Sequence, residues 1–420
     1  MKRVQRIAAA GVRQAWLWRN RSAFCEAAAA GGARLFVDVS TIMRRDARTG
    51  IQRVVRAVWS ELRRRAAENL VVQPVFATSA RGYCLAPAQF LSGISSDWRA
   101  EPVKVHSGDK FLGLDLAAHL LPRYRRQLAA WKTHGATIHL MLYDLLPLTQ
   151  PEWFSAATTS NFRKWIDVLV NDADQAICIS SHVAQALRSH LTDIGRAGPE
   201  IVQMRMGADI AASIPSTGIS PEVSHLLEKL RFRPTILMVG TVEPRKGYDV
   251  VLAAFESLWQ SFPSDAPDLI IVGKPGWKTA SIQRQLRIHP QRGRRLHWLT
   301  EVSDEALCSL YSACTGVVIA SRGEGFGLPL IEAAQFRRHV LARDLPVFRE
   351  HRLANASYFQ DDYPASLAGR LMDLARAGKA GPAPAADLAL WSDCVDGLLR
   401  EIGLPQTRCR ETRSPLRKAS

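Results

Sequence analysis

The chain has 420 residues, of which 47% are hydrophobic and 22% are charged, so it reads as a globular protein too long for one compact core. Its formal net charge of +16 favours anionic partners, and the charge alone does not choose among nucleotide diphosphates, acidic lipids and nucleic acids. No run of about 18 uninterrupted apolar residues is present, which argues against a membrane-spanning helix, and the cysteines lack the close pairs of a zinc site.

Residues 1–33 are expected to form a basic extension. Their cations precede the first acid of the chain, Glu26, and residues 16–18 add two tryptophans. Such a segment suits the surface of an anionic membrane, and a disordered or poorly packed extension fits the sequence equally well. The apolar stretch at residues 7–12 is short and is followed by Arg13, which argues against a signal peptide.

A first domain is expected over residues 34–210. Apolar runs of strand length alternate there with helical patterns, which is typical of a parallel sheet covered by helices. The stretch at residues 79–122 shows no clear pattern of either kind. The expected strands cover residues 35–39, 71–76, 138–143 and 176–179, and the expected helices cover residues 51–65 and 156–170.

Residues 211–221 are expected to link this domain to a second one, because prolines and glycine interrupt a stretch rich in Ser and Thr. The second domain, residues 222–385, repeats the alternation of strands and helices. Residues 386–403 have helical spacing and predict a helix that crosses back to the first domain, and a basic tail, residues 404–420, follows. The expected strands of the second domain cover residues 236–239, 269–272, 296–299 and 317–320, and the expected helix covers residues 248–262.

Two adjacent cations lie in the loop after the first strand of the second domain. The run from Gly240 to Gly247 places Arg245 and Lys246 between a strand and a helix. Arginine offers a planar fork to phosphate oxygens and lysine a mobile point charge, so the natural partner of the two side chains is a diphosphate. Taken alone, a solvated surface loop is the alternative.

A glycine-rich turn at residues 322–333 carries two carboxylates eight residues apart. It follows the strand at residues 317–320 and leads into a helix whose first turn contains Pro329. The glycines allow backbone amides to approach a ligand closely, and the start of the helix faces a phosphate. Glu324 in the loop and Glu332 about one turn into the helix can accept hydrogen bonds from the hydroxyls of one bound molecule. A plain turn with surface acids is the alternative.

Together, the runs at residues 240–247 and 322–333 resemble glycosyltransferase family 4, the retaining enzymes with the GT-B fold. The resemblance extends from about residue 35 to residue 402. It implies an α/β protein in which two Rossmann-like domains face a cleft, the N-terminal one for the acceptor and the C-terminal one for the nucleotide sugar. It assigns Arg245 and Lys246 to the donor diphosphate and Glu332 to the ribose. It assigns the donor sugar to Glu324, as a catalytic residue, and to the neighbouring backbone of Gly325, Phe326 and Gly327.

The first domain resembles the family less closely. The run from Thr49 to Arg53 is similar to the glycine turn by which the family's N-terminal domain approaches donor phosphates, and it predicts Gly50 as a donor-binding residue, although the usual turn has two glycines. Tyr143 and Asp144 open a segment similar to a His-Asp-Leu-Ile-Pro type in relatives that build polysaccharides. Tyrosine replaces the histidine here, so the resemblance gives Asp144 as the second catalytic residue, with a structural turn as the alternative.

Other signals carry less weight. Thr241 stands where many relatives have an arginine, which gives Arg245 a larger share of the phosphate contact. Asp172 and Asp174 have the Asp-x-Asp spacing of a metal-dependent glycosyltransferase fold, but they lie between a helix and a strand, and a solvated helix end is favoured. The histidines show no ligand spacing. No metal and no cofactor are therefore expected, with the nucleotide sugar as a substrate.

The leading hypothesis is a retaining glycosyltransferase that moves a sugar from a nucleoside diphosphate donor to a glycan or lipid-linked acceptor in cell-surface polysaccharide synthesis. GDP-mannose is the first donor considered and rhamnose the next sugar. The expected location is cytoplasmic, with peripheral contact to the anionic inner face of the cytoplasmic membrane. Alternatives are a nucleotide-sugar epimerase or hydrolase on the same fold, a non-catalytic glycan binder and a basic nucleic-acid binder. Nucleic acid is not expected, because no motif of a known nucleic-acid module is present.

Overall fold

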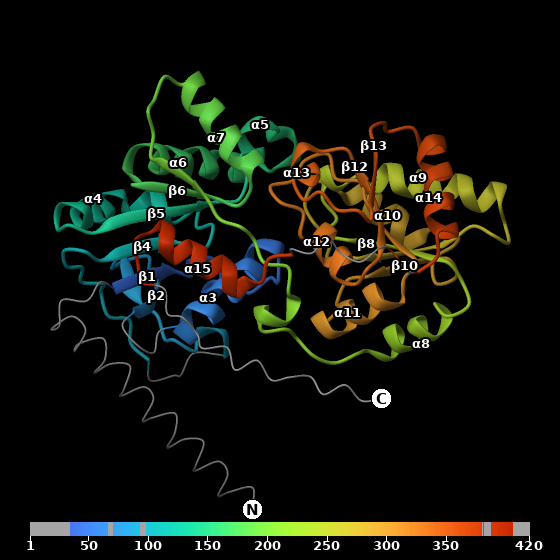
Figure 1. Cartoon of the computed structure of the whole chain (residues 1–420), viewed down its shortest axis with the longest axis horizontal. Helices are drawn as coiled ribbons and strands as arrows, with labels where there is room; N and C mark the ends of the chain where they lie inside the picture. The colour runs from blue at the N-terminus through green and yellow to red at the C-terminus, as the bar shows by residue number, and fades with distance from the viewer. Residues whose placement is uncertain (1–33, 66–69, 93–97, 380, 382–387, 406–420) are drawn as a thin grey trace, which may run out of the picture.

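The computed structural model describes residues 34–65, 70–92, 98–379, 381 and 388–405. This part of the chain forms two α/β domains that lie beside each other, each built on one sheet (Figure 1). The expected basic extension at residues 1–33 and nearly all of the basic tail lie outside the described residues.

The first domain holds a seven-stranded sheet in the order β3-β2-β1-β4-β5-β6-β7, in which only the pairing of β2 with β3 is antiparallel. Its strands are β1 (Arg34–Asp38), β2 (Val71–Ala77), β3 (Tyr83–Leu85), β4 (Lys110–Gly113), β5 (Thr137–Leu142), β6 (Gln175–Cys178) and β7 (Glu200–Gln203). Its helices are α2 (Ser40–Arg44), α3 (Gly50–Arg65), α4 (Arg125–Thr133), α5 (Leu146–Thr149), α6 (Ala156–Asp172) and α7 (Ser181–Asp193).

Burial on both faces explains why the central strands are apolar. Strands β1 and β6 are buried along their whole length, as expected for parallel strands covered by helices. Helix α3 covers the sheet with a stripe that includes Val54, Val58 and Leu62 at helical spacing. Helix α7 begins after Ser180, whose hydroxyl accepts a hydrogen bond from the Val183 amide. Periodicity and capping therefore specify these elements locally.

The second domain holds a six-stranded parallel sheet in the order β10-β9-β8-β11-β12-β13. Its strands are β8 (Thr235–Val239), β9 (Asp268–Val272), β10 (Leu296–Leu299), β11 (Gly316–Ile319), β12 (His339–Arg343) and β13 (Ala356–Phe359). Its helices are α8 (Pro221–Lys229), α9 (Tyr248–Ser261), α10 (Ala280–Ile288), α11 (Asp304–Ala313), α12 (Leu328–Gln335), α13 (Pro346–Arg349) and α14 (Pro364–Arg376).

The last helix, α15 (Trp391–Glu401), returns to the first domain and lies beside α3 (Figure 1). Its buried face, which includes Trp391 and Leu398, belongs to the first domain's core. Arg65 of α3 donates to Asp396 at 2.7 Å and to the Ser392 carbonyl oxygen at 2.8 Å. The crossing helix expected from the sequence is thus present, with apolar packing and ion pairing on α3.

Both sheets turn a topological switch point toward the region between the domains. In the first sheet the strand order reverses between β1 and β4, and in the second it reverses between β8 and β11. Ligands of open α/β sheets bind at the carboxyl ends of the strands beside such a reversal. Gly50 begins α3, which follows β1 and the short helix α2, and the loops after β8 and β11 contain Arg245 and Glu324. The topology therefore brings these sequence-predicted site residues to one place.

The stretch at residues 79–122 contributes more than its sequence indicates. It contains the edge strand β3 and the central strand β4, which pairs with both β1 and β5. Strand β4 is only four residues long, and Gly108 and Asp109 precede it. A run of four residues next to turn residues is too short to show a clear strand periodicity, and its burial between β1 and β5 is set by the tertiary structure.

Candidate active site between the domains

A cavity of about 680 Å³ lies between the two domains. It is lined by residues of both domains, and all of the sequence-predicted site residues are on its wall. From the first domain these are Gly50, Tyr143 and Asp144, and from the second Arg245, Lys246, Glu324, Gly325, Phe326, Gly327 and Glu332.

Glu324 lies between the two cations that precede α9. Its carboxylate accepts hydrogen bonds from Arg245 Nη1 at 2.8 Å and from Lys246 Nζ. Arg245 also donates to the Gly323 carbonyl oxygen at 2.8 Å, so its guanidinium joins the loops after β8 and β11. Burial pushes the pKa of Glu324 upward, but the two cations outweigh burial and lower this pKa to about 2. Glu324 is therefore an anion at physiological pH.

A second carboxylate balances the charge of this cluster. Arg245 Nε donates to Glu243 Oε2 at 2.9 Å, and Glu243 is itself largely buried. Burial alone would lower the pKa of Arg245, and the carboxylates of Glu324 and Glu243 raise it above its usual value. Two cations and two anions thus hold one another in place, which preorganises the guanidinium and ammonium groups at the cavity wall.

The residues directly before α9 and α12 are glycines, and close contacts with neighbouring atoms require glycine at both positions. Gly247 has φ +72°, and a Cβ there would lie 2.4 Å from the Ala320 carbonyl oxygen, at the end of β11. Gly327 has φ +93°, and a Cβ there would lie 2.4 Å from the Phe348 ring. Glycine is the residue that adopts this left-handed backbone without strain. These positions let α9 and α12 begin next to each other at the switch point.

The Arg322–Gly327 loop also contacts the first domain. A Cβ on Gly325 would lie 1.9 Å from the Tyr143 carbonyl oxygen, and Ser180 Oγ donates to the Gly325 carbonyl oxygen at 2.7 Å. Asp144 lies against the same glycine, and its carboxylate accepts a hydrogen bond from the Leu146 amide at 3.0 Å. Burial raises the pKa of Asp144, an effect that the nearby Arg245 opposes. Asp144 and Glu324 are thus brought to the same end of the cavity.

Phe326 is fixed by its neighbours in the second domain. Its ring packs edge to face against His351, with 4.6 Å between ring centroids, and the Phe326 carbonyl oxygen lies 2.9 Å from His351 Nε2. Burial lowers the pKa of His351, which favours the neutral imidazole. The Phe326 side chain therefore supports the loop from behind, while its backbone remains next to the cavity.

Glu332 has protein partners on both carboxylate oxygens. Oε1 accepts a hydrogen bond from Arg53 of the first domain, and Oε2 accepts one from Tyr311 Oη at 2.9 Å. The side chain of Glu332 is only 3% exposed. The sequence predicts this residue about one turn into the helix, and the structure places it in α12 on the cavity wall. The sequence gave no sign that Arg53 contacts this carboxylate.

Gly50 is exposed at the first position of α3. A Cβ there would meet only the Leu328 side chain, at 3.8 Å, which is ordinary van der Waals contact. The protein's own packing therefore does not demand a glycine here. The position does allow a ligand to approach the start of α3 closely.

Asp172 and Asp174 are bonded to groups of the first domain. Asp172 lies 2.5 Å from Arg125 Nε, and Asp174 lies 2.9 Å from Lys132 Nζ and accepts the Ile138 amide at 2.7 Å. Among the described residues, no group of three or more His, Cys, Asp and Glu side chains could hold a metal ion. Within the same residues, no helix combines the length and the apolar character needed to cross a membrane.

Several residues of this region could not be recognised from the sequence. Glu243 and Ser180 fall next to turns without a distinctive pattern, and Arg53 and Asp304 meet across the cleft although they are 251 residues apart. The quoted turn around Gly50 includes Arg53, so a signal existed for its location, but none for its partners.

Comparison with known proteins places these observations in a family context. Residues 233–377 match the family described as glycosyl transferases group 1. The chain is 38% identical over 346 residues to the serotype-specific mannosyltransferase WbdA of Escherichia coli, an alignment that covers 81% of this chain and 42% of WbdA. It is 36% identical over 108 residues to O-antigen chain mannosyltransferase B of Escherichia coli, covering 25% of this chain and 27% of that protein. The chain thus spans less than half the length of these curated relatives.

A solved structure shows the same fold. The Anabaena protein HepE, determined in complex with UDP and glucose, has a TM-score of 0.58 and 14% identity, and the superposition covers 88% of this chain and 99% of HepE. At this identity the likeness concerns the fold alone. The expectation of a GT-B arrangement, two Rossmann-like domains with a cleft between them, is confirmed.

Proposed function

Because the chain carries a group 1 glycosyltransferase domain and has the GT-B fold, we propose that it is a retaining glycosyltransferase. It would transfer a sugar from a nucleoside diphosphate donor to a hydroxyl of a growing cell-surface glycan. The observation that carries the proposal is the buried Glu324 between Arg245 and Lys246 at the switch point of the second sheet.

The two cations would receive the donor's diphosphate. Arg245 and Lys246 are already fixed at the cavity wall by Glu243 and Glu324, so little reorganisation is needed when the donor binds. As the bond to the leaving group breaks, negative charge accumulates on the diphosphate, and fixed cations stabilise it more than they stabilise the intact donor. Metal-independent transfer would follow from this arrangement.

Glu324 and Asp144 would orient the donor sugar. An ionised Glu324 accepts hydrogen bonds from sugar hydroxyls, and its negative charge also favours positive charge that develops on the sugar ring. Asp144 approaches from the first domain, against Gly325, and so joins the acceptor side of the cleft to the donor loop. Retention requires the acceptor hydroxyl on the face that the diphosphate leaves, and closing of the two domains would hold it there.

The identity of the sugar and acceptor is the finer part of the proposal. Similarity to WbdA, a mannosyltransferase by name, favours mannose, and GDP-mannose is the donor we propose first. O-antigen mannosyltransferases among the similar proteins favour a glycan or lipid-linked acceptor. The net charge of +16 favours peripheral contact with an anionic membrane, and deletion of residues 1–30 is expected to release the protein from vesicles containing anionic lipid. Vesicle binding that persists would move this contact to another surface.

Acceptor dependence tests the activity. Purified protein is incubated with GDP-mannose or a UDP, dTDP or ADP sugar, with and without an oligosaccharide acceptor preparation, and product is followed by mass spectrometry. A transferase extends the acceptor by one sugar residue and releases nucleoside diphosphate in proportion. Release of free sugar without acceptor would support a hydrolase, and a changed sugar on an intact nucleotide would support an epimerase.

A further inference from the structure

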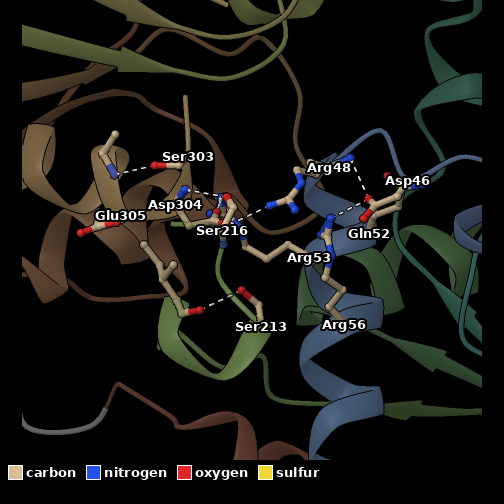
Figure 2. A network of polar contacts seen from close by, with 12 residues as sticks. Asp46, Arg48, Gln52, Arg53, Arg56, Ser213, Ser216, Ser303, Asp304 and Glu305 are labelled. Atoms are coloured by element: carbon tan, nitrogen blue, oxygen red, sulfur yellow. Dashed lines mark hydrogen bonds and ion pairs between the residues drawn. The ribbon is translucent and has the colours of Figure 1, made fainter. Parts of the chain in front are cut away.

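Arg53 connects the two domains through two carboxylates. Its guanidinium projects from α3 toward the second domain, where Nη2 lies 3.0 Å from Asp304 Oδ1 (Figure 2). Nη1 donates to Glu332 Oε1. Burial would lower the pKa of Arg53, and Glu332 and Asp304 together raise it. Arg53 is thus a charged group held between two anions of the other domain.

The two carboxylates are held differently. Asp304 begins α11, and its Oδ2 accepts hydrogen bonds from the Ser216 amide at 2.8 Å and the Ser216 hydroxyl at 2.9 Å (Figure 2). Ser216 belongs to the segment that joins the domains, so Asp304 is fixed from the linker. The other carboxylate oxygen of Glu332 accepts a hydrogen bond from the Tyr311 hydroxyl. Glu332 also lines the cavity, where a ligand can reach it.

From this geometry we infer that Arg53 is a positioning residue that exchanges partners when the donor binds. Before the donor binds, Arg53 holds the Glu332 carboxylate; on binding, it releases this carboxylate to the ribose hydroxyls of the donor and keeps its contact with Asp304. The inference rests on the proposed function, because Glu332 is there assigned to the ribose. The retained contact then holds α3 of the first domain against α11 of the second while transfer takes place.

The exchange has a measurable consequence. Because Arg53 pairs with Glu332 in most molecules, the carboxylate is free for a ribose in only a fraction of them. The apparent dissociation constant for the nucleotide is the intrinsic one divided by that fraction. Removing the guanidinium should therefore tighten nucleotide binding while it slows transfer, because the domains lose this one of their contacts. Removing the charge of Asp304 should weaken nucleotide binding, because Arg53 then stays paired with Glu332.

The experiment measures GDP and UDP dissociation constants by calorimetry for the full chain and its variants. For the nucleoside diphosphate that the wild type binds, Arg53→Gln is expected to lower the dissociation constant by about tenfold. This factor applies if Arg53 contacts Glu332 in about nine molecules of ten. Asp304→Asn, which keeps an acceptor oxygen for Ser216, is expected to weaken binding. Arg56→Gln is the matched control, because Arg56 lies one turn further along α3 and pairs with Asp46 instead; its binding should stay within about twofold of the wild type.

Two further readouts separate exchange from a structural defect. In a Glu332→Gln background, Arg53→Gln should no longer tighten binding, because the competing carboxylate is gone. With a transferable donor, Arg53→Gln should lower kcat together with KM, whereas damage to folding would raise KM and lower the unfolding temperature of Arg53→Gln below that of the Arg56→Gln control. Unchanged or weaker nucleotide binding in Arg53→Gln overturns the inference alone. Failure of the wild type to bind any of GDP, UDP, dTDP and ADP rejects the proposed function, and the inference with it.

Discussion

In the second domain the buried carboxylate of Glu324 lies between two cations, whereas in the first domain the buried carboxyls of Asp38 and Asp115 accept hydrogen bonds from neutral groups. Tyr83 Oη donates to Asp38 at 2.7 Å, and the Ile42 amide donates to Asp115 at 2.6 Å. The cations bring the pKa of Glu324 down to about 2. Burial raises the pKa of Asp38 to about 6 and that of Asp115 to about 7.

This difference separates a charged cluster on the cavity wall from carboxyls inside a domain, because Glu324 is among the residues that line the cavity and Asp38 and Asp115 are not. Fixed and balanced charges, as around Arg245 and Lys246, suit a ligand that carries its own negative charge, such as a diphosphate. Burial without a neighbouring cation favours the neutral form of a carboxyl, and the hydrogen-bond partners of Asp38 and Asp115 are groups of the first domain itself. The comparison therefore supports the proposal that the donor's charged part binds at the second domain.

The largest expected effect comes from breaking the charged cluster. Glu324→Ala and Lys246→Ala should each lower kcat by about 100-fold or more, because both remove preorganised charge from the transition state. Steady-state kinetics with circular dichroism as a folding check measures this. Glu256→Gln is the control, since Glu256 is half exposed and pairs with His289 instead. Near-normal turnover in either cluster variant would remove that residue from the site.

A smaller loss of kcat is expected when the contact between the donor loop and the first domain is disturbed. Gly325→Ala would push a Cβ against the Tyr143 carbonyl oxygen, 1.9 Å away, and so separate the donor loop from the first domain. A misplacement of about 1 Å can cost up to about 100-fold in rate, and a loss of about tenfold or more in kcat is expected. Gly369→Ala in α14, where a Cβ meets nothing within 4 Å, is the matched control. Equal activity of both variants would show that the contact is dispensable.

Nucleotide binding should respond to changes that leave the fold intact. Gly50→Ala meets only ordinary contact in the protein, so its stability should stay the same or rise by up to about 1 kcal/mol. If donor phosphates approach the start of α3, the added methyl group should weaken nucleotide binding by about tenfold. Glu332→Ala should likewise chiefly weaken donor binding. Thermal unfolding and calorimetry on the same samples measure both quantities, and unchanged affinity would refute the assigned donor contact.

An effect outside the cleft concerns pH and the stability of the first domain. Burial raises the folded-state pKa of Asp115 to about 7, above the ordinary value of 3.8, so the folded state binds the extra proton. Its contribution to stability is present below about pH 4 and is lost as the pH rises through about 7. The Asp115→Asn variant should flatten this dependence, by on the order of 1 kcal/mol per pH unit at most. Unfolding free energies between pH 4 and pH 8 measure it, and identical slopes would contradict the raised pKa.

The sequence predicted the second domain better than the first for a physical reason. The runs at residues 240–247 and 322–333 each combine a buried strand, a glycine turn and charged residues within one short segment, so local pattern was sufficient. The short strand β4 and the contact of Arg53 with Glu332, 279 residues apart, depend on tertiary packing. Local periodicity carries no information on how two domains meet, which is why the partners of Glu332 had to come from the structure.

The most direct test of the account is a calorimetric titration of the wild type and Lys246→Ala with GDP, UDP, dTDP and ADP and their sugar conjugates, each with and without chelator. The account predicts that the wild type binds one nucleotide series with the same affinity in both conditions, and that Lys246→Ala binds it at least about tenfold more weakly. Absence of binding by all of them, or affinity that Lys246→Ala leaves unchanged, would contradict a donor site built on the Glu324 cluster.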